Sequence, residues 1–207
     1  MTFASSRETG RIPVIAVLGA PGSGKTYFLN HLLSSPALKN TVVLTGSDDL
    51  HTTHHSDRLQ RLASLREPSE SGCLCCGMRS ELGDALRDLF LRALTKKTSP
   101  VDRVVIEANS IDPSPLKFTL KHAPFLGQRY VFQSAFLLLD VTQLCVKPLN
   151  LQGLGVEFAD YVVFSKAEMI DKALLQELRL GVKQLNSKVK LVLCVDMLEA
   201  LIANTLH

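Results

Sequence analysis

Two short segments of the sequence carry residue types and spacings that could do chemistry. The segment GAPGSGKT, residues 19–26, has the spacing G-x-x-x-x-G-K-[ST] of a phosphate-binding loop. The segment GCLCCG, residues 72–77, places three thiols within four positions. The sequence therefore raises two hypotheses for one chain of 207 residues, nucleotide binding and the binding of a soft metal ion.

The phosphate-binding motif needs each of its residue types. Glycines let the backbone curl around an anion without Cβ clashes, and amides at a helix N-terminus point at phosphate oxygens. Lys25 would reach the β- and γ-phosphates, and the Thr26 hydroxyl would ligate Mg²⁺. An apolar run before the motif and an amphipathic run after it argue against a chance glycine-rich turn. We expect the nucleotide to be held by Gly19, Gly22, Ser23, Gly24, Lys25, Thr26 and Tyr27.

A phosphate-binding loop also needs a carboxylate at the end of a neighbouring strand, where it can hold the Mg²⁺ shell or polarise water. Glu107 ends the run VVIE and has this place in the sequence. Asp140 ends the run FLLLD and is a competing candidate. Alternatively, Glu107 has no catalytic role and is simply a solvated carboxylate at the end of a strand.

The thiol cluster has a spacing suited to a single soft ion. On an extended backbone, Cys73 and Cys75 would lie on one side, with Cys76 next to them. Three thiolates can bind Zn²⁺, Co²⁺ or Cu⁺ and leave a fourth position for a nitrogen, an oxygen or a transferred ligand. Free cysteines are often small buried hydrophobic residues instead, but the flanking glycines and the polar approach weigh against this alternative.

Three histidines lie in the polar loop upstream of the thiols. His51, His54 and His55 could add metal ligands, because positions four apart can share a helical face. A solvated loop explains them slightly better, so their role stays open.

The elements that must position these groups alternate between strands and helices. Helical spacing of apolar residues predicts helices at residues 25–35, 80–97 and 169–186. Apolar, β-branched runs predict six strands, at residues 12–18, 41–46, 101–108, 134–141, 160–166 and 189–195. Helical crossovers imply an α/β fold with a mainly parallel sheet and helices on both faces. We predict a flexible leader at residues 1–10 and one domain at residues 11–207, in which residues 46–80 form a long functional loop.

Composition limits the partners and the setting. A net charge of +3 with scattered basic residues gives no electrostatic argument for nucleic acid. The most apolar run is too short to span a membrane. The five cysteines are an odd number, and three of them are too close together to pair, so no disulfide framework is expected. A reducing cytoplasm is the expected setting.

The order of these motifs resembles the CobW family of metal-chaperone GTPases. GAPGSGKTYFLNHLL resembles the family's Walker A motif and first helix, and GCLCCGMR resembles its cysteine signature. VVIEANSIDPSPL resembles its acidic strand end, and FADYVVFSKAEMID resembles its guanine-recognition stretch. The agreement covers nearly all of residues 12–195. It implies a three-layer P-loop NTPase fold, as in urease and hydrogenase nickel chaperones, and GTP-driven metal insertion into a client protein.

The resemblance also implies roles for single residues, and it selects Glu107 rather than Asp140 as the catalytic carboxylate. It implies GTP, with ATP as an alternative, and Mg²⁺ as cofactors. The three cysteines would bind Zn²⁺ or Co²⁺ for a client metalloprotein, and cobalamin biosynthesis is one setting that the family suggests. A homodimer that depends on nucleotide or metal is compatible with it. The implied roles are catalysis for Lys25, Glu107 and Asp49, guanine recognition for Ser165, Lys166 and Glu168, and Mg²⁺ binding for Thr26 and Asp48.

Four departures from the family pattern bear on activity. The family's N-K-x-D reads SKAE at residues 165–168, and the longer side chain of Glu168 predicts weaker guanine selectivity. Asn109 and Ser110 replace the glycine after the acidic strand, which bears on coupling between the γ-phosphate and the switch. The acidic switch stretch reads TGSDDL, in which Asp48 or Asp49 could supply the carboxylate. The family's C-terminal domain has no counterpart after the sixth strand, as expected for a minimal member or a truncated chain.

Two alternatives to a metal-delivering GTPase stay open on the sequence. The altered SKAE and EANSID stretches favour a catalytically degenerate module that binds nucleotide or metal as a regulator or partner subunit. A small P-loop kinase is less favoured, because the sequence has no arginine-rich lid; Arg58, Arg61 and Arg66 form only a modest basic cluster.

Overall fold

The computed structural model describes residues 10–34, 36–46, 59–62, 74–95, 100–144 and 151–192. Except for Gly10, the predicted leader at residues 1–10 lies outside these ranges.

One sheet of seven parallel strands forms the centre of the described structure. The strands are β1 (Ile12–Leu18), β2 (Thr41–Thr45), β3 (Leu59–Arg61), β4 (Arg103–Ala108), β5 (Tyr130–Asp140), β6 (Tyr161–Ser165) and β7 (Lys190–Val192). Their order is β3-β2-β4-β1-β5-β6-β7, and each neighbouring pair runs parallel. The strands that follow β1 in the chain lie on both sides of it, so the carboxyl end of β1 is a switch point of the topology, where α/β sheets bind ligands.

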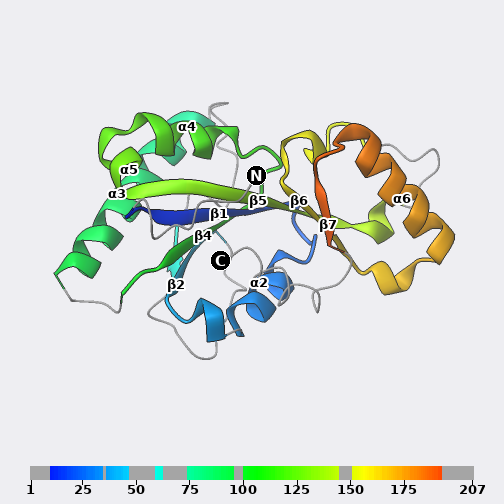
Figure 1. Cartoon of the computed structure of the whole chain (residues 1–207), viewed down its shortest axis with the longest axis horizontal. Coiled ribbons are helices and arrows are strands. Elements are labelled where there is room, and N and C mark those ends of the chain that lie inside the picture. Colours follow the sequence, from blue (N-terminus) through cyan, green and yellow to red (C-terminus); the bar gives the residue numbers. More distant parts are fainter. Residues whose placement is uncertain are drawn as a thin grey trace.

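Helices cover both faces of the sheet (Figure 1). The helices are α2 (Lys25–Ser34), α3 (Leu74–Leu94), α4 (Ser114–His122), α5 (Pro124–Arg129) and α6 (Lys172–Leu185). On one face, Phe28, Leu29 and Leu32 of α2 pack against inward residues of β1, β2 and β4. On the other face, α3, α4, α5 and α6 bury a leucine-rich cluster against the sheet. The predicted three-layer α/β P-loop fold is therefore confirmed.

Five of the six predicted strands are observed with ends shifted by no more than a few residues, and β7 is described as far as Val192. Three expectations were wrong or incomplete. An extended backbone was expected at the thiol segment, but from Leu74 onward the chain is helical, because α3 begins at that residue. Apolar positions at 75, 78, 82, 86 and 89 keep the three-to-four-residue period of a helix back to its first turn.

The sequence also missed a seventh strand and two helices. The predicted loop 46–80 contains β3, which is only three residues long and pairs with β2 at the edge of the sheet. Such a short strand has no periodic signal of its own, so its pairing with β2 defines it. Helices α4 and α5, together with the early start of β5 at Tyr130, fill the interval 114–133 to which no element was assigned.

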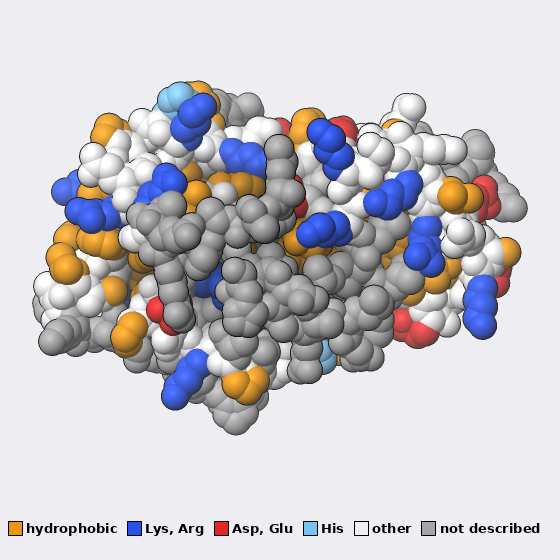
Figure 2. Space-filling model, viewed as in Figure 1, with side chains coloured by type: hydrophobic (Ala, Val, Ile, Leu, Met, Phe, Trp, Pro, Cys, Tyr) orange, Lys and Arg blue, Asp and Glu red, His pale blue; other side chains and the backbone are white. Residues whose placement is uncertain are grey.

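None of the described helices is both long enough and apolar enough to cross a membrane. Figure 2 shows Lys and Arg side chains spread over one face of the molecule, among hydrophobic and uncharged ones.

Candidate functional site

The loop between β1 and α2 has the backbone of an anion cradle. Gly19, Gly22 and Gly24 adopt φ angles of 149°, 78° and 89°, which favour glycine. A Cβ on Gly19 would lie 2.7 Å from the carbonyl oxygen of Leu138, and one on Gly24 would lie 3.2 Å from Cβ of Ser165. The loop therefore lies close against β5 and the end of β6: a Cβ on Gly19 would clash with backbone, and one on Gly24 would require Ser165 to shift.

Ser23, inside this loop, has a buried hydroxyl group. Its side chain is 3% exposed, and within the described ranges its Oγ has no hydrogen-bond partner. Buried hydroxyl groups normally have a partner, and a phosphate oxygen in the loop would supply one. Together with the shape of the loop, this orphaned atom fits a bound phosphate chain.

Lys25 is the first residue of α2 and is 5% exposed. Its Nζ donates hydrogen bonds to the carbonyl oxygens of Gly19 and Ala20, both at 2.9 Å. Burial lowers the pKa of Lys25, and the negative charge of Glu107 partly offsets this effect. A phosphate would be a stronger, charge-assisted acceptor for this ammonium group than the two carbonyls. The two residues that follow are more exposed to solvent than Lys25: Thr26 is half-buried, and Tyr27 is 69% exposed.

Glu107 lies at the end of β4, between β1 and β2. In the parallel registers it lies opposite Val17 of β1 and Thr45 of β2. The carboxylate is buried, at 4% exposure, and its Oε2 accepts a hydrogen bond from Oγ1 of Thr45. The fold thus places this carboxylate next to the phosphate loop, as the sequence pattern predicts.

Asp140, the competing carboxylate, is engaged on the other side of β1. It accepts hydrogen bonds from the backbone nitrogen of Thr142 at 3.0 Å and from its hydroxyl at 2.6 Å. It also forms an ion pair with Lys166, with 2.5 Å between Oδ2 and Nζ. Burial alone would raise the pKa of Asp140, but the hydrogen bonds from Lys166 and Thr142 hold it below its ordinary value. The sequence did not indicate this role of Asp140 as the partner of Lys166.

The SKAE stretch at residues 165–168 is brought to the phosphate loop by the end of β6. Ser165 packs against Gly24, and its hydroxyl donates to the carbonyl oxygen of Leu139 at 3.3 Å. Lys166 has φ 57°, the one positive φ among the described residues other than glycine. Glu168 follows in the 3₁₀ turn Ala167–Met169 and is exposed to solvent.

The segment that follows β4, residues 109–111, contacts Gly19 and Gly155. The Gly19 nitrogen donates to the carbonyl oxygen of Ser110 at 2.9 Å, which ties the phosphate loop to this segment. On its other side, Gly155 has φ 82°, and a Cβ there would overlap the carbonyl oxygen of Ile111. The replacement of the expected glycine by Asn109 and Ser110 therefore leaves a segment with defined contacts on both sides.

A model of the CobW/HypB/UreG nucleotide-binding domain matches residues 13–193. The chain belongs to this family. The resemblance found in the motifs is thus confirmed over most of the sequence. The GTPase class and a general role in metal handling are properties of the family, whereas the metal and client of this member are separate questions.

Individual relatives agree with this assignment. The zinc chaperone YjiA of Escherichia coli (strain K12) is 29% identical over a match of 168 residues, and the match covers 78% of this chain and 51% of the relative. The chain therefore spans about half the length of that relative.

Solved structures show the same fold at low sequence identity. The Zn(II)-bound YjiA GTPase from E. coli has a TM-score of 0.65 at 21% identity, covering 88% of this chain and 57% of that one. HypB from Helicobacter pylori in complex with nickel has a TM-score of 0.56 at 22% identity, covering 94% and 85%. The hydrogenase maturation factor HypB from Archaeoglobus fulgidus has a TM-score of 0.61 at 16% identity, covering 95% and 92%.

Several candidate site residues named from the sequence fall outside the described structure. These are Asp48, Asp49, His51, His54, His55 and Cys73. Cys75 and Cys76 belong to the first turn of α3, so the predicted alternation along an extended backbone does not apply to them. Within the described ranges, no group of three or more His, Cys, Asp or Glu residues is arranged to hold a metal ion.

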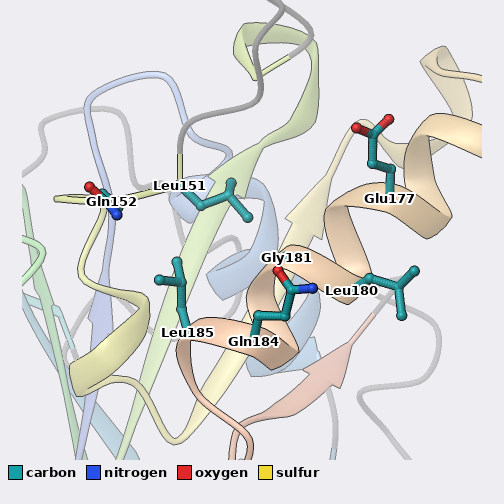
Figure 3. Close-up of a pocket in the computed structure, with 7 residues that line it drawn as sticks. All are labelled: Leu151, Gln152, Glu177, Leu180, Gly181, Gln184 and Leu185. Carbon is teal, nitrogen blue, oxygen red and sulfur yellow. The ribbon is translucent and has the colours of Figure 1, made fainter.

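Two surface hollows lie elsewhere in the described structure. One, of about 470 Å³, lies beside α6, and Leu151, Gln152, Leu180 and Gln184 are among its lining residues (Figure 3). Another, of about 380 Å³, is lined partly by Lys117, Lys188 and Lys190. Neither includes a predicted nucleotide-binding residue, so neither marks the phosphate site.

Proposed function

We propose that the chain is a GTP-hydrolysing metallochaperone that binds a transition metal, Zn²⁺ or Co²⁺, and delivers it to a client metalloprotein. The observation that carries the proposal is the phosphate loop with Lys25 and Glu107 beside it, in a chain that belongs to the CobW/HypB/UreG family. The orphaned Ser23 hydroxyl and the glycine backbone angles support phosphate as the ligand.

Each part of the site would have a separate task. Loop amides, Ser23 and Lys25 would bind the phosphates, and Thr26 would ligate Mg²⁺, with Asp48 as a further candidate. The bound Mg²⁺ would neutralise charge that develops on the phosphates. Glu107 would orient the attacking water or a water of the Mg²⁺ shell, and Asp49 is a further catalytic candidate. Ser165, Lys166 and Glu168 would recognise the base, with Lys166 held in place by Asp140.

The metal would be the cargo of the chaperone. Cys73, Cys75 and Cys76 are the proposed ligands, because thiolates prefer soft and borderline ions. The relative YjiA, named a zinc chaperone, supports zinc, whereas the similar structure of HypB is a complex with nickel. The proposed setting is the cytoplasm, with no nucleic acid or membrane as partner.

Lys25→Ala tests the nucleotide site. Loss of the ammonium group should weaken binding of GTP with Mg²⁺ by about 3 kcal/mol or more, because it removes charge-assisted contacts with the phosphates. Calorimetry with GTP, GDP and ATP measures this loss, and metal content is determined on the same samples. The matched control is Lys188→Ala, which alters an exposed lysine distant in sequence from the loop and should leave the affinity unchanged. Unchanged affinity in Lys25→Ala would contradict the assignment.

A second function, a degenerate nucleotide- or metal-binding regulator, is favoured by one observation. The base-recognition stretch carries Glu168 in place of the family's aspartate, and this side chain is exposed. Steady-state phosphate release with and without Zn²⁺ separates the two functions. A chaperone should turn over GTP and respond to metal, whereas a regulator should bind without turnover.

A further inference from the structure

Thr45 is the first residue of the TGSDDL stretch, in which only the two aspartates received a role from the sequence. It ends β2, is fully buried at 0% exposure, and lies opposite Glu107 in the register of β2 with β4. Its Oγ1 donates a hydrogen bond to Oε2 of Glu107. The hydroxyl thus contacts the carboxylate that the proposed function places beside the phosphates.

The arrangement restricts what the carboxylate can do. A threonine hydroxyl has one proton to donate, so Thr45 donates to Oε2 and does not occupy Oε1 of Glu107. The β-branched side chain of threonine is stiff at χ1, so the strand backbone sets the direction of this donor. Thr45 approaches from the β2 side, whereas the phosphate loop follows β1 on the other side of β4.

We propose that Thr45 is a positioning residue, which fixes Glu107 so that Oε1 is presented to the water or Mg²⁺ shell at the γ-phosphate. This inference rests on the proposed function, because it assumes that Glu107 acts during nucleotide hydrolysis. A purely structural role would be to satisfy a buried carboxylate, which contributes to folding without setting a rate.

Three single substitutions separate these roles. Thr45→Val keeps the shape of the side chain and removes the donor, whereas Thr45→Ser keeps the donor. The matched control is Thr41→Val, the same change at the opposite end of β2, where the threonine is 1% exposed. Thr41 lies opposite Arg103 and is remote from the phosphate loop in the register.

The readouts are kcat and KM for GTP with excess Mg²⁺, GTP affinity with and without Mg²⁺, and thermal unfolding. Thr45→Val is expected to lower kcat by about tenfold or more with KM changed less than about twofold, because misplacing a reacting group by an ångström can lower rates about a hundredfold. Thr45→Ser should retain at least about half of the wild-type kcat, and Thr41→Val should leave kcat unchanged. In a Glu107→Gln background, Thr45→Val should change the residual single-turnover rate less than about twofold.

If wild-type turnover is too slow to measure, the gain in GTP affinity on adding Mg²⁺ replaces kcat. The expected order is then wild type and Thr45→Ser above Thr45→Val. Three results would overturn this inference and leave the proposed function standing. They are a kcat of Thr45→Val equal to that of the wild type, an equal loss of kcat in Thr45→Val and Thr41→Val, and a loss of single-turnover rate from Thr45→Val in the Glu107→Gln background as large as its loss of kcat in the wild type. A wild-type chain that binds no nucleotide would overturn the proposed function and, with it, this inference.

Discussion

At the scale of single residues, Glu168 is expected to set the strength of base selection. Its carboxylate projects one methylene beyond the aspartate of the family pattern, and hydrogen bonds to guanine depend on correct reach. We expect the wild type to prefer GTP over ATP only modestly, and Glu168→Asp to raise that preference about tenfold, or about 1.4 kcal/mol. Competition binding of the two nucleotides measures the ratio. A wild-type preference of several thousandfold would contradict the role given to the longer side chain.

The ion pair between the buried Asp140 and the half-exposed Lys166 predicts a pH dependence of stability. Because the folded-state pKa of Asp140 is below its ordinary value, its stabilising contribution is present above about pH 4 and is lost as the pH falls further. Asp140→Asn should lower the unfolding free energy at pH 7 by about 1–2 kcal/mol, a value limited by the half-exposed Lys166. The loss should shrink in urea unfolding at pH 3. Asp88→Asn, which breaks the exposed pair with Arg92, is the control and should change stability by less than about 0.5 kcal/mol.

At the scale of elements, two glycines in one turn have different consequences for the phosphate loop. Gly153 and Gly155 both have positive φ, but only a Cβ on Gly155 would overlap the segment after β4. Gly153→Ala should lower the unfolding free energy by about 1 kcal/mol from backbone strain alone, and Gly155→Ala by about 3 kcal/mol. The carbonyl oxygen of Ser110, next to Ile111, accepts a hydrogen bond from the Gly19 nitrogen of the phosphate loop. Gly155→Ala should therefore also weaken GTP binding severalfold, whereas Gly153→Ala should not. Equal effects of the two substitutions on GTP affinity would show that this contact does not reach the nucleotide.

At the scale of the whole molecule, the thiols and the phosphate loop should act together. We expect one equivalent of Co²⁺ to bind with thiolate charge-transfer absorption, and its affinity to fall as pH drops, because thiols must lose protons to ligate. Replacing Cys73, Cys75 or Cys76 by serine should weaken metal binding far more than replacing Cys145 or Cys194, the two cysteines outside the cluster. GTP with Mg²⁺ should change the metal affinity, and metal must change the nucleotide affinity by the same factor. Affinities that are independent in both directions would separate the two sites and remove the mechanism of delivery.

Local patterns in the sequence were sufficient for the phosphate loop and most of the sheet. The motif at residues 19–26 combines glycines, a lysine and a threonine whose tasks depend on adjacent backbone, so its spacing predicts its geometry. Buried parallel strands appear as continuous apolar runs, which located five strands closely. The position of Glu107 beside the loop also follows, because carboxyl ends of parallel strands meet at one edge of a sheet.

Contacts between segments distant in sequence decided the partners of the two buried carboxylates and the presence of β3. The pairing of Thr45 with Glu107 depends on the register of β2 against β4, and that of Asp140 with Lys166 on β5 against β6; each pair is separated by tens of residues. The three-residue strand β3 exists through its pairing with β2 rather than through its own composition. Sequence alone thus predicted the glycine-rich loop and its lysine, because the geometry of that loop is local. Tertiary structure decided the side-chain partner of each carboxylate, Thr45 for Glu107 and Lys166 for Asp140, because burial and register are properties of the assembled sheet.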